Sequence, residues 1–334
     1  MSLPVTLIPG DGIGPEVVAA AVEVIEAAGA RIDWQWASAG AGAMATHGTP
    51  VPQETLESIR RTHLALKGPV GAAAAEKHRP VMAALRKEFD LYATVRTARS
   101  LDGIATRFTG VDIVVVREST QGAYSGIEHF VDDERSAAES ISIITRRGSE
   151  RVVEYAFAFA ARHGRKTVTL VHKANVLRAT SALFLEAGRA VAARHPATAF
   201  NELIVDDCAM RLVIDPTGFD VLVTTNLFGD ILSDLTAGLV GGLAVTSSAS
   251  VGPSTAIFEA AHGTAPDLAG KGTANPTAAM LAGVQLLAHV GERAAADKLD
   301  AAIRGTIASR AAVTADLGGG ATTKQFTQAV LARL

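Results

Sequence analysis

The fold class is indicated most directly by the stretch Val221-Leu222-Val223-Thr224-Thr225-Asn226-Leu227-Phe228-Gly229-Asp230-Ile231-Leu232-Ser233-Asp234. Its apolar run, Val221–Thr224, has the length and character of a strand that is covered on both faces. The residues Ile231–Leu239 have the apolar spacing of a helix. A buried strand that leads directly into a helix is typical of α/β proteins.

The same alternation of short apolar runs and amphipathic runs continues on both sides of this stretch. The apolar runs predict strands at Val5–Ile8, Ile32–Ala37, Leu64–Lys67, Leu91–Val95, Asp112–Val116, Ile141–Thr145 and Thr167–Val171. The amphipathic runs predict helices at Pro15–Ala28, Ser149–Arg162, Val176–Ala193, Thr277–His289 and Ala294–Ser309. We therefore expect an α/β protein with layers of helices around a sheet.

Length and composition favour two lobes and a small-molecule ligand. A chain of 334 residues exceeds the roughly 250–300 residues at which a single hydrophobic core stops growing. Apolar residues make up 48% of the chain and charged residues only 19%, which excludes a disordered protein. The net charge of −3 provides no basic field for nucleic acid or an anionic membrane. The single cysteine, Cys208, excludes an internal disulfide and a thiolate metal site.

The N-terminus predicts a cytoplasmic protein. The first residues, up to Ile8, lack the basic region and the long apolar run of a signal peptide. The uncharged stretch Leu235–Phe258 has 24 residues, enough to cross a bilayer, but 12 of them are Gly, Ser, Thr or Pro. That composition favours buried turns and packed helix ends over a membrane span.

A glycine-rich loop follows the first predicted strand. Gly10–Glu16 reads Gly-Asp-Gly-Ile-Gly-Pro-Glu, and Asp33 lies 23 residues after Gly10, as in a dinucleotide-binding fingerprint. Pro15 stands where the third glycine of that fingerprint is required. A plain strand-to-helix turn and a dinucleotide site both remain open on spacing alone.

Asp230 and Asp234 form the most informative pair of acidic residues. If a helix begins near Gly229, these carboxylates are at positions i and i+4 and project to one side. Two carboxylates so placed repel each other unless a cation lies between them, and oxygen ligands suit Mg²⁺ or Mn²⁺. Asp230 could instead cap the helix, with Asp234 a solvated acid of the first turn. The two interpretations have similar weight.

Four cations border apolar segments. Arg86, Arg96 and Arg117 lie in or beside such segments, and Lys173 follows a predicted strand at the end where α/β sheets bind ligands. Arginine at a strand end forms paired hydrogen bonds with carboxylates. Three arginines beside a candidate metal site favour a substrate with several carboxylates.

Six motifs together resemble those of the metal-dependent β-decarboxylating dehydrogenases, the isocitrate/isopropylmalate dehydrogenase family. The motifs are Gly10–Glu16, Leu85–Tyr92, Tyr124–His129, His172–Asn175, Asn226–Asp234 and His262–Asp267. They occur in the order of the family from residue 7 to about residue 320, so the resemblance covers nearly the whole chain. Within this family the motif Tyr124–His129 is most similar to NAD-linked isocitrate and homoisocitrate dehydrogenases.

The resemblance implies a two-domain α/β fold without the Rossmann topology, in which helices flank a central mixed sheet. The large, cofactor-binding domain is expected at 1–98 and 247–334. The small domain, for dimerisation and for metal and substrate binding, is expected at 99–246. It also implies a homodimer whose active sites are shared between subunits.

The resemblance assigns roles residue by residue. The substrate carboxylates are expected to bind Arg86, Arg96 and Arg117. Mg²⁺ or Mn²⁺ is expected to bind Asp230 and Asp234, with Asp206 and Lys173 supplied by the other subunit; Asp207 could exchange roles with Asp206. Lys173 and Tyr124 are the expected catalytic residues, because the reaction needs a base at the C2 hydroxyl and a proton donor for the enol.

NAD is the expected hydride acceptor. The loop His262-Gly263-Thr264-Ala265-Pro266-Asp267 resembles the one that holds adenosine in the family. Asp267 can accept hydrogen bonds from ribose hydroxyls but would repel a 2′-phosphate. Asn275 is expected to make a further contact on the adenine side. The expected cofactor residues are His262, Gly263, Thr264, Ala265, Asp267 and Asn275.

The segment 68–83 departs most from the family pattern and leaves the C3 substituent of the substrate open. Met82 would line an apolar pocket, whereas Arg79 would suit an anionic group. Further departures are Thr94, Thr97, Ser119 and Gln121. Oxidative decarboxylation of isocitrate to 2-oxoglutarate is the first prediction, ahead of homoisocitrate, 3-isopropylmalate and other C3-substituted malates, including one that bears a phosphonate. A non-catalytic regulatory subunit is the alternative of another class.

Overall fold

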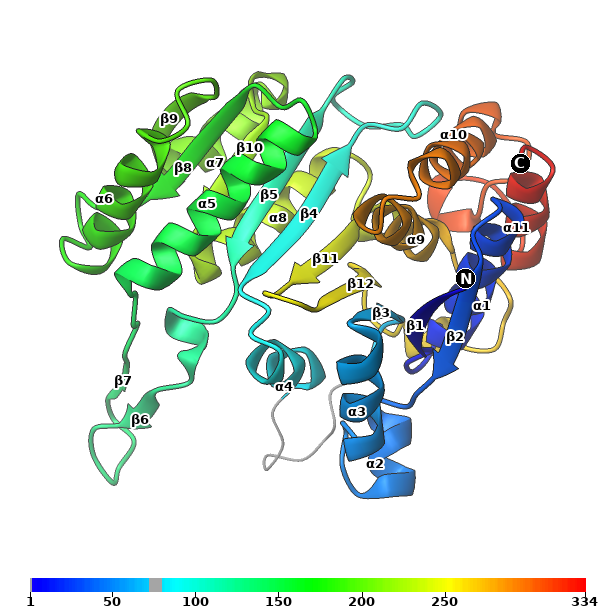
Figure 1. Ribbon diagram of the computed structural model, residues 1–334, viewed down its shortest axis with the longest axis horizontal. Helices are drawn as coiled ribbons and strands as arrows, with labels where there is room; N and C mark the ends of the chain where they lie inside the picture. The colour runs from blue at the N-terminus through cyan, green and yellow to red at the C-terminus, as the bar shows by residue number, and fades with distance from the viewer. Residues whose placement is uncertain (1, 72–79) are drawn as a thin grey trace. The chain divides into compact units, whose positions relative to one another are not determined.

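The computed structural model describes residues 2–71 and 80–334, and the chain divides into two compact units (Figure 1). The terminal unit comprises Met1–Phe89, Ser100–Thr109 and Val240–Leu334, and the middle unit comprises Asp90–Arg99 and Gly110–Leu239. The expected domains, 1–98 with 247–334 and 99–246, differ from these two units in where the chain passes from one to the other. Strand β4 (Ala93–Arg99) belongs to the middle unit, and the chain then returns briefly to the terminal unit.

In the described part of the terminal unit, five strands pair in a mixed arrangement. Their order is β2 (Ile32–Trp36), β1 (Leu3–Ile8), β3 (Leu64–Lys67), β12 (Ala256–Ala260) and β11 (Ser247–Val251). The first four are parallel, and β11 is antiparallel to β12. Strand β3 is buried along its whole length, which explains why it reads as a continuous apolar run rather than an alternating one.

The described residues of the terminal unit also form seven helices. They are α1 (Gly14–Ala27), α2 (Ala41–His47), α3 (Gln53–Thr62), α4 (Val81–Glu88), α9 (Thr277–His289), α10 (Arg293–Ser309) and α11 (Thr323–Leu331). Helix α9 packs on β11 and β12 and also against α1 and α10. Its small side chains allow this close approach: a Cβ at Gly283 would lie 2.4 Å from Cδ1 of Ile25 in α1.

The glycine-rich loop after β1 is a point where backbones cross. A Cβ at Gly10 would lie 2.1 Å from the carbonyl oxygen of Pro69, and one at Gly12 would lie 2.1 Å from that of Thr264. The amide of Ile13 donates to the same Thr264 carbonyl at 2.9 Å. The glycines therefore allow the loop to pack between two other segments. This packing accounts for the glycines of the motif, so they need not belong to a dinucleotide-binding fingerprint.

Within the middle unit the strands of the sheet follow the order β4, β5 (Asp112–Glu118), β10 (Val221–Thr224), β8 (Thr167–His172) and β9 (Ala199–Ile204). β4 is antiparallel to β5, and the other pairs are parallel. Helix α5 (Arg146–Arg162) packs on β5, β8 and β10, and α8 (Asn226–Leu239) packs on β4, β5 and β10 from the opposite face (Figure 1). The remaining helices are α6 (Thr180–Ala192) and α7 (Val205–Ile214).

Two predicted elements of the middle unit are corrected by the structure. Residues 141–145 do not form a strand; β6 (Glu128–Phe130) and β7 (Ala138–Ser140) form an antiparallel hairpin that projects from the sheet of this unit (Figure 1). Helix α8 begins at Asn226 rather than near Gly229 or Ile231. Gly229 is inside the helix, since its amide donates to the carbonyl of Thr225 at 2.9 Å.

None of the helices in residues 2–71 and 80–334 combines the length and apolar character needed to cross a bilayer. The uncharged stretch Leu235–Phe258 forms the end of α8, a short turn, β11 and most of β12. Its many small polar residues thus lie in tightly packed strands and turns, as the composition indicated.

Candidate active site

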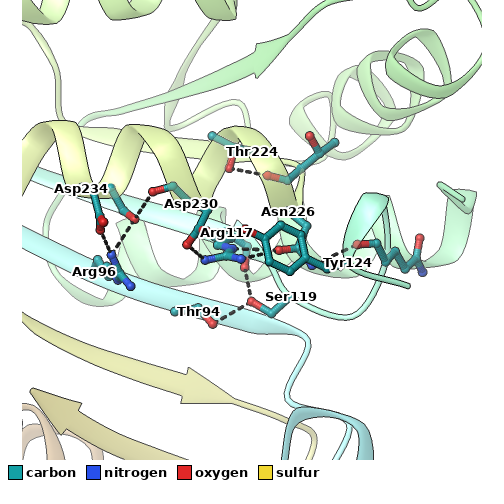
Figure 2. A network of polar contacts seen from close by, with 12 residues as sticks. Thr94, Arg96, Arg117, Ser119, Tyr124, Thr224, Asn226, Asp230 and Asp234 are labelled. Carbon is teal, nitrogen blue, oxygen red and sulfur yellow. Dashed lines mark hydrogen bonds and ion pairs between the residues drawn. The ribbon is translucent and has the colours of Figure 1, made fainter. Parts of the chain in front are cut away.

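Arg117 occupies the centre of a polar network at one edge of the middle sheet (Figure 2). It is the penultimate residue of β5 and pairs in register with Thr94 of β4 and Thr224 of β10. Its side chain is only 4% exposed. Nε and Nη2 donate to Oδ1 of Asn226 at 2.9 and 2.7 Å, and Nη1 donates to Asp230. A buried guanidinium is tolerable only with such compensation.

The two predicted metal-binding residues of α8 each pair with an arginine of the adjacent strands. Asp230 pairs with Arg117 of β5, and Asp234 pairs with Arg96 of β4 (Figure 2). Arg96 also donates from Nη1 to Oγ of Ser233 at 3.0 Å. The predicted i, i+4 relation is therefore present, and each carboxylate pairs with an arginine of a strand on which α8 packs.

The electrostatics of Asp230 favour its charged form. Burial opposes the charge, but the hydrogen bond from Tyr124 and the charges of Arg117 and Arg96 together lower the pKa of Asp230 below its usual range. A carboxylate at this position is thus ionised over the whole neutral range and available as an oxygen ligand.

Tyr124 lies over Arg117 with its hydroxyl directed at Asp230. It belongs to a short 3₁₀ turn, Ala123–Ser125, and its ring centre lies 4.9 Å from Cζ of Arg117. The hydroxyl donates to Asp230, and this hydrogen bond is the main reason why the pKa of Tyr124 is raised above its ordinary value. Tyr124 therefore stays protonated. Because the residue is also 52% exposed, its hydroxyl can donate a proton to a bound molecule.

Lys173 and Asp206 form a separate pair in the same unit. Lys173 follows β8 directly, Asp206 lies in the first turn of α7, and Nζ donates to the carboxylate. This hydrogen bond holds the pKa of Asp206 below its usual value. Asp207, the alternative to Asp206, pairs instead with Arg211 at 3.0 Å on its own helix.

The predicted metal ligands are not brought together within one chain. Among residues 2–71 and 80–334, no three His, Cys, Asp or Glu side chains lie close enough to hold a metal ion. Asp230 and Asp234 supply oxygen donors of the kind that Mg²⁺ or Mn²⁺ prefers, whereas Asp206 contacts Lys173. The donor chemistry of these two carboxylates fits a divalent ion, and the expected third ligand, Asp206, does not join them in the described chain.

The other predicted substrate residues belong to the terminal unit. Met82 and Arg86 are at i and i+4 on α4, so they lie on one side of that helix. Both are half-buried. Arg79 lies outside the described residues.

Two departures from the family pattern contact each other. Thr94 of β4 and Ser119, just after β5, share a hydrogen bond of 2.6 Å between their buried hydroxyls. Oγ of Ser119 also donates to the carbonyl of Arg117 at 3.2 Å. Gln121 bonds through its side chain to Thr145, the N-cap of α5, at 2.8 Å. These departures therefore brace the backbone around Arg117 and the start of α5.

The predicted cofactor residues lie in two segments of the terminal unit. Residues 262–267 follow β12, and Gly263 and Asp267 in them are exposed. Burial lowers the pKa of His262, whose Nδ1 donates to the carbonyl of Gly263 at 2.9 Å. Ala265 has a φ of +38°, a left-handed conformation that is strained for a residue with a Cβ.

Asn275 is held by a residue that the sequence analysis did not identify. Its Nδ2 donates to Asp316 at 2.8 Å, and its Oδ1 accepts from the amide of Thr277 at 3.0 Å. Glu16 fixes the neighbouring residue by accepting from the amide of Ala274 at 3.0 Å. No periodicity or motif indicated Asp316, because it acts through a long-range contact. Glu16 ends the motif Gly10–Glu16, but its contact with Ala274 is also long-range and the motif gave it no role.

A family model described as isocitrate/isopropylmalate dehydrogenase matches residues 4–330. The chain belongs to this family. The predicted family and the predicted α/β fold, with a central mixed sheet flanked by helices, are therefore confirmed.

Several relatives align with nearly the whole of this chain. The mitochondrial NAD isocitrate dehydrogenase catalytic subunit 5 of Arabidopsis thaliana is 47% identical over 326 residues, which cover 97% of this chain and 87% of the relative. The mitochondrial NAD isocitrate dehydrogenase subunit alpha of Homo sapiens is 46% identical over 331 residues, covering 99% and 90%. The crystal structure of isocitrate dehydrogenase from Methylococcus capsulatus has a TM-score of 0.95 and 51% identity, covering 100% and 99%.

The names of these relatives bear out the predicted reaction and cofactor and overturn the predicted location. The relatives are called NAD isocitrate dehydrogenases, in agreement with an NAD-linked oxidoreductase. The prediction of a cytoplasmic protein is wrong by this comparison, since the curated relatives are named mitochondrial. That prediction rested on the character of the first eight residues, which does not specify a compartment.

Gly229 is the position at which the network around Arg117 leaves no space. A Cβ there would lie 2.7 Å from Cβ and Cγ of Arg117 and 2.3 Å from Oγ1 of Thr224. We expect Gly229→Ala to lower the free energy of unfolding by about 1–3 kcal/mol, because the core around the strand end cannot yield without displacing Arg117. Urea denaturation followed by circular dichroism measures the change.

Gly305→Ala is the matched control, since Gly305 also lies inside a helix, α10, and a Cβ there would meet only the end of Arg333 at 3.5 Å. That variant is expected to be neutral or more stable by up to about 1 kcal/mol, the usual gain of alanine over glycine in a helix. Equal effects of the two substitutions would contradict the packing described for Gly229.

Proposed function

We propose that the protein is a metal-dependent dehydrogenase that oxidises and decarboxylates isocitrate to 2-oxoglutarate with NAD as hydride acceptor. The observation that carries the proposal is the network in which Arg117, Arg96, Asp230, Asp234 and Tyr124 meet at one edge of the middle sheet (Figure 2). The isocitrate dehydrogenase names of the relatives support the choice of substrate.

The charges of the site match a hydroxy acid with several carboxylates. Arg96 and Arg117 present guanidinium groups that can bind carboxylates through two hydrogen bonds each. In the described chain these arginines pair with Asp234 and Asp230. A divalent ion at the two aspartates would take over the neutralisation of their charge and leave the arginines to bind the substrate.

The residues of this chain have separable roles in the reaction. When bound, the metal ion supplies Lewis-acid stabilisation of negative charge on oxygen, and NAD supplies the hydride acceptor. Tyr124 is a phenol whose proton is retained by its hydrogen bond to Asp230, and it is the proposed donor of the proton to the carbon that loses CO₂. Lys173 is the proposed base at the C2 hydroxyl, with Asp206 orienting its amine.

A second copy of this chain is the proposed source of the missing metal ligand. Helices α7 and α8, which pack against each other, expose apolar side chains: Met210, Val213, Ile214, Leu227 and Ile231. Ile214 is 65% exposed and Ile231 is 59% exposed, which is costly for a surface in water. The same helices carry Asp206, Asp230 and Asp234. A two-fold pairing of these faces would give each copy the Asp206 and the Lys173 of the other.

The NAD reduction assay with Mn²⁺ and a panel of C3-substituted malates tests the activity. We expect isocitrate to give the highest kcat/KM, and Asp230→Asn to lower it by about 1,000-fold or more, because the amide cannot replace a charged ligand. Asp297→Asn, at an exposed acidic residue of α10, is the control and should leave the rate unchanged.

A higher kcat/KM for homoisocitrate or 3-isopropylmalate would replace isocitrate as the substrate. Absence of turnover with every malate, combined with tight isocitrate binding, would favour the regulatory-subunit alternative. An unchanged rate in Asp230→Asn would remove that residue from the site.

Subunit mixing tests the shared site. Asp206→Asn and Asp230→Asn should each be inactive alone, but unfolding and refolding them together should restore about a quarter of the wild-type activity. Half of the dimers are then mixed, and each mixed dimer has one site with both aspartates intact. Asp207→Asn, refolded in the same way, is the control, and it should be active without mixing with a second variant.

Recovery of no activity, when both variants refold to dimers of normal stability, would mean that each site is built from one chain. An inactive Asp207→Asn and an active Asp206→Asn would exchange the roles of the two residues.

A further inference from the structure

We infer that Asn226 is a positioning residue that orients the guanidinium of Arg117 for a carboxylate of the substrate, an inference that rests on the proposed function. Asn226 is the first residue of α8 and is 1% exposed. Its Oδ1 accepts two hydrogen bonds from Arg117, from Nε at 2.9 Å and from Nη2 at 2.7 Å (Figure 2). No feature of the sequence distinguished this residue from the rest of its motif.

The orientation of the Asn226 amide follows from its neighbours. An arginine side chain can only donate hydrogen bonds, so it must face the amide oxygen. On the other side, Nδ2 donates to the main-chain carbonyl of Gln121 at 2.9 Å, and a carbonyl can only accept. Both ends of the amide are therefore fixed, and a flipped amide would lose all three hydrogen bonds.

The amide in turn fixes the plane of the Arg117 guanidinium. Asn226 holds the edge formed by Nε and Nη2, and Asp230 holds Nη1. The ring of Tyr124 covers one face, with its centre 4.9 Å from Cζ. A planar group held on one edge and covered on one face cannot rotate without breaking these contacts, so its direction is set before a substrate arrives.

A neutral acceptor is needed at this position. Arg117 already has one carboxylate partner, Asp230. A second carboxylate at 226 would neutralise the guanidinium further and weaken its attraction for an anionic substrate. An asparagine supplies the same oxygen without the charge. It thus orients Arg117 and leaves its positive charge available.

Asn226 also connects Arg117 to the segment that carries Tyr124. Gln121, whose carbonyl accepts from Asn226, lies three residues before Tyr124. Gly122 between them has a φ of +81°, and a Cβ there would lie 3.5 Å from Cβ of Asn226. One buried amide therefore holds both the cation and the loop of the proposed proton donor in place.

Steady-state kinetics of Asn226→Asp and Asn226→Ala with isocitrate, NAD and Mn²⁺ test this role. We expect each substitution to raise the KM for isocitrate by about 10- to 100-fold, the usual effect of losing hydrogen bonds to a charged group, and to leave the KM for NAD within about twofold. Asn226→Asp is nearly isosteric and retains the acceptor oxygen, so it tests the need for a neutral amide even if Asn226→Ala fails to fold. Asn201→Ala, in β9, is the control and should change neither constant.

A double-mutant cycle separates positioning from a merely structural role. A lysine at position 117 lacks the pair of guanidinium donors, Nε and Nη2, that Asn226 binds. Adding Asn226→Ala to Arg117→Lys should therefore cost less than about threefold in kcat/KM for isocitrate. An equal loss in both backgrounds, or an unchanged KM for isocitrate in both Asn226 variants, would overturn the inference. Failure of the wild-type protein to turn over isocitrate would instead overturn the proposed function.

Discussion

The buried charge of Arg117 is the constraint on which the site of the middle unit depends. A guanidinium that is 4% exposed must be surrounded by acceptors, and the structure supplies Asp230, Asn226 and the face of Tyr124. The absence of a Cβ at Gly229 provides the space for its stem. Each of these residues comes from a segment that begins where a central strand ends, because neighbouring parallel strands deliver their carboxyl ends to the same edge.

The ionic part of the site could be predicted from the sequence because its signals are local. Asp230 and Asp234 share a helix at i and i+4, and Arg117 and Lys173 follow continuous apolar runs that form buried strands. The resemblance to the dehydrogenase family supplied the roles. The fold class followed in the same way, since the runs that became β1, β3, β5, β8 and β10 are short, apolar and separated by amphipathic helices.

The rest depended on contacts between segments far apart in the chain. Gly229 resembled a helix boundary, but it lies inside α8, where the side chain of Arg117 requires a glycine. Strand β11 reads Ser-Ser-Ala-Ser-Val and lacks a strand-like apolar pattern; it forms because it pairs antiparallel with β12. Asn226 and Asp316 carry no periodic signal, and their roles follow from the atoms they contact. The separation of Asp206 from Asp230 within one chain could not be read from spacing either.

The central claim is that α8 provides two ligands of a divalent ion and a second copy of the chain provides the third. Anomalous diffraction from crystals grown with Mn²⁺ and isocitrate tests it most directly. We predict one strong manganese peak per chain, bound by Asp230 and Asp234 of that chain and by Asp206 of a second copy, with Arg117 and Arg96 on the substrate carboxylates. A peak bound by one chain alone, or located away from α8, would contradict the account.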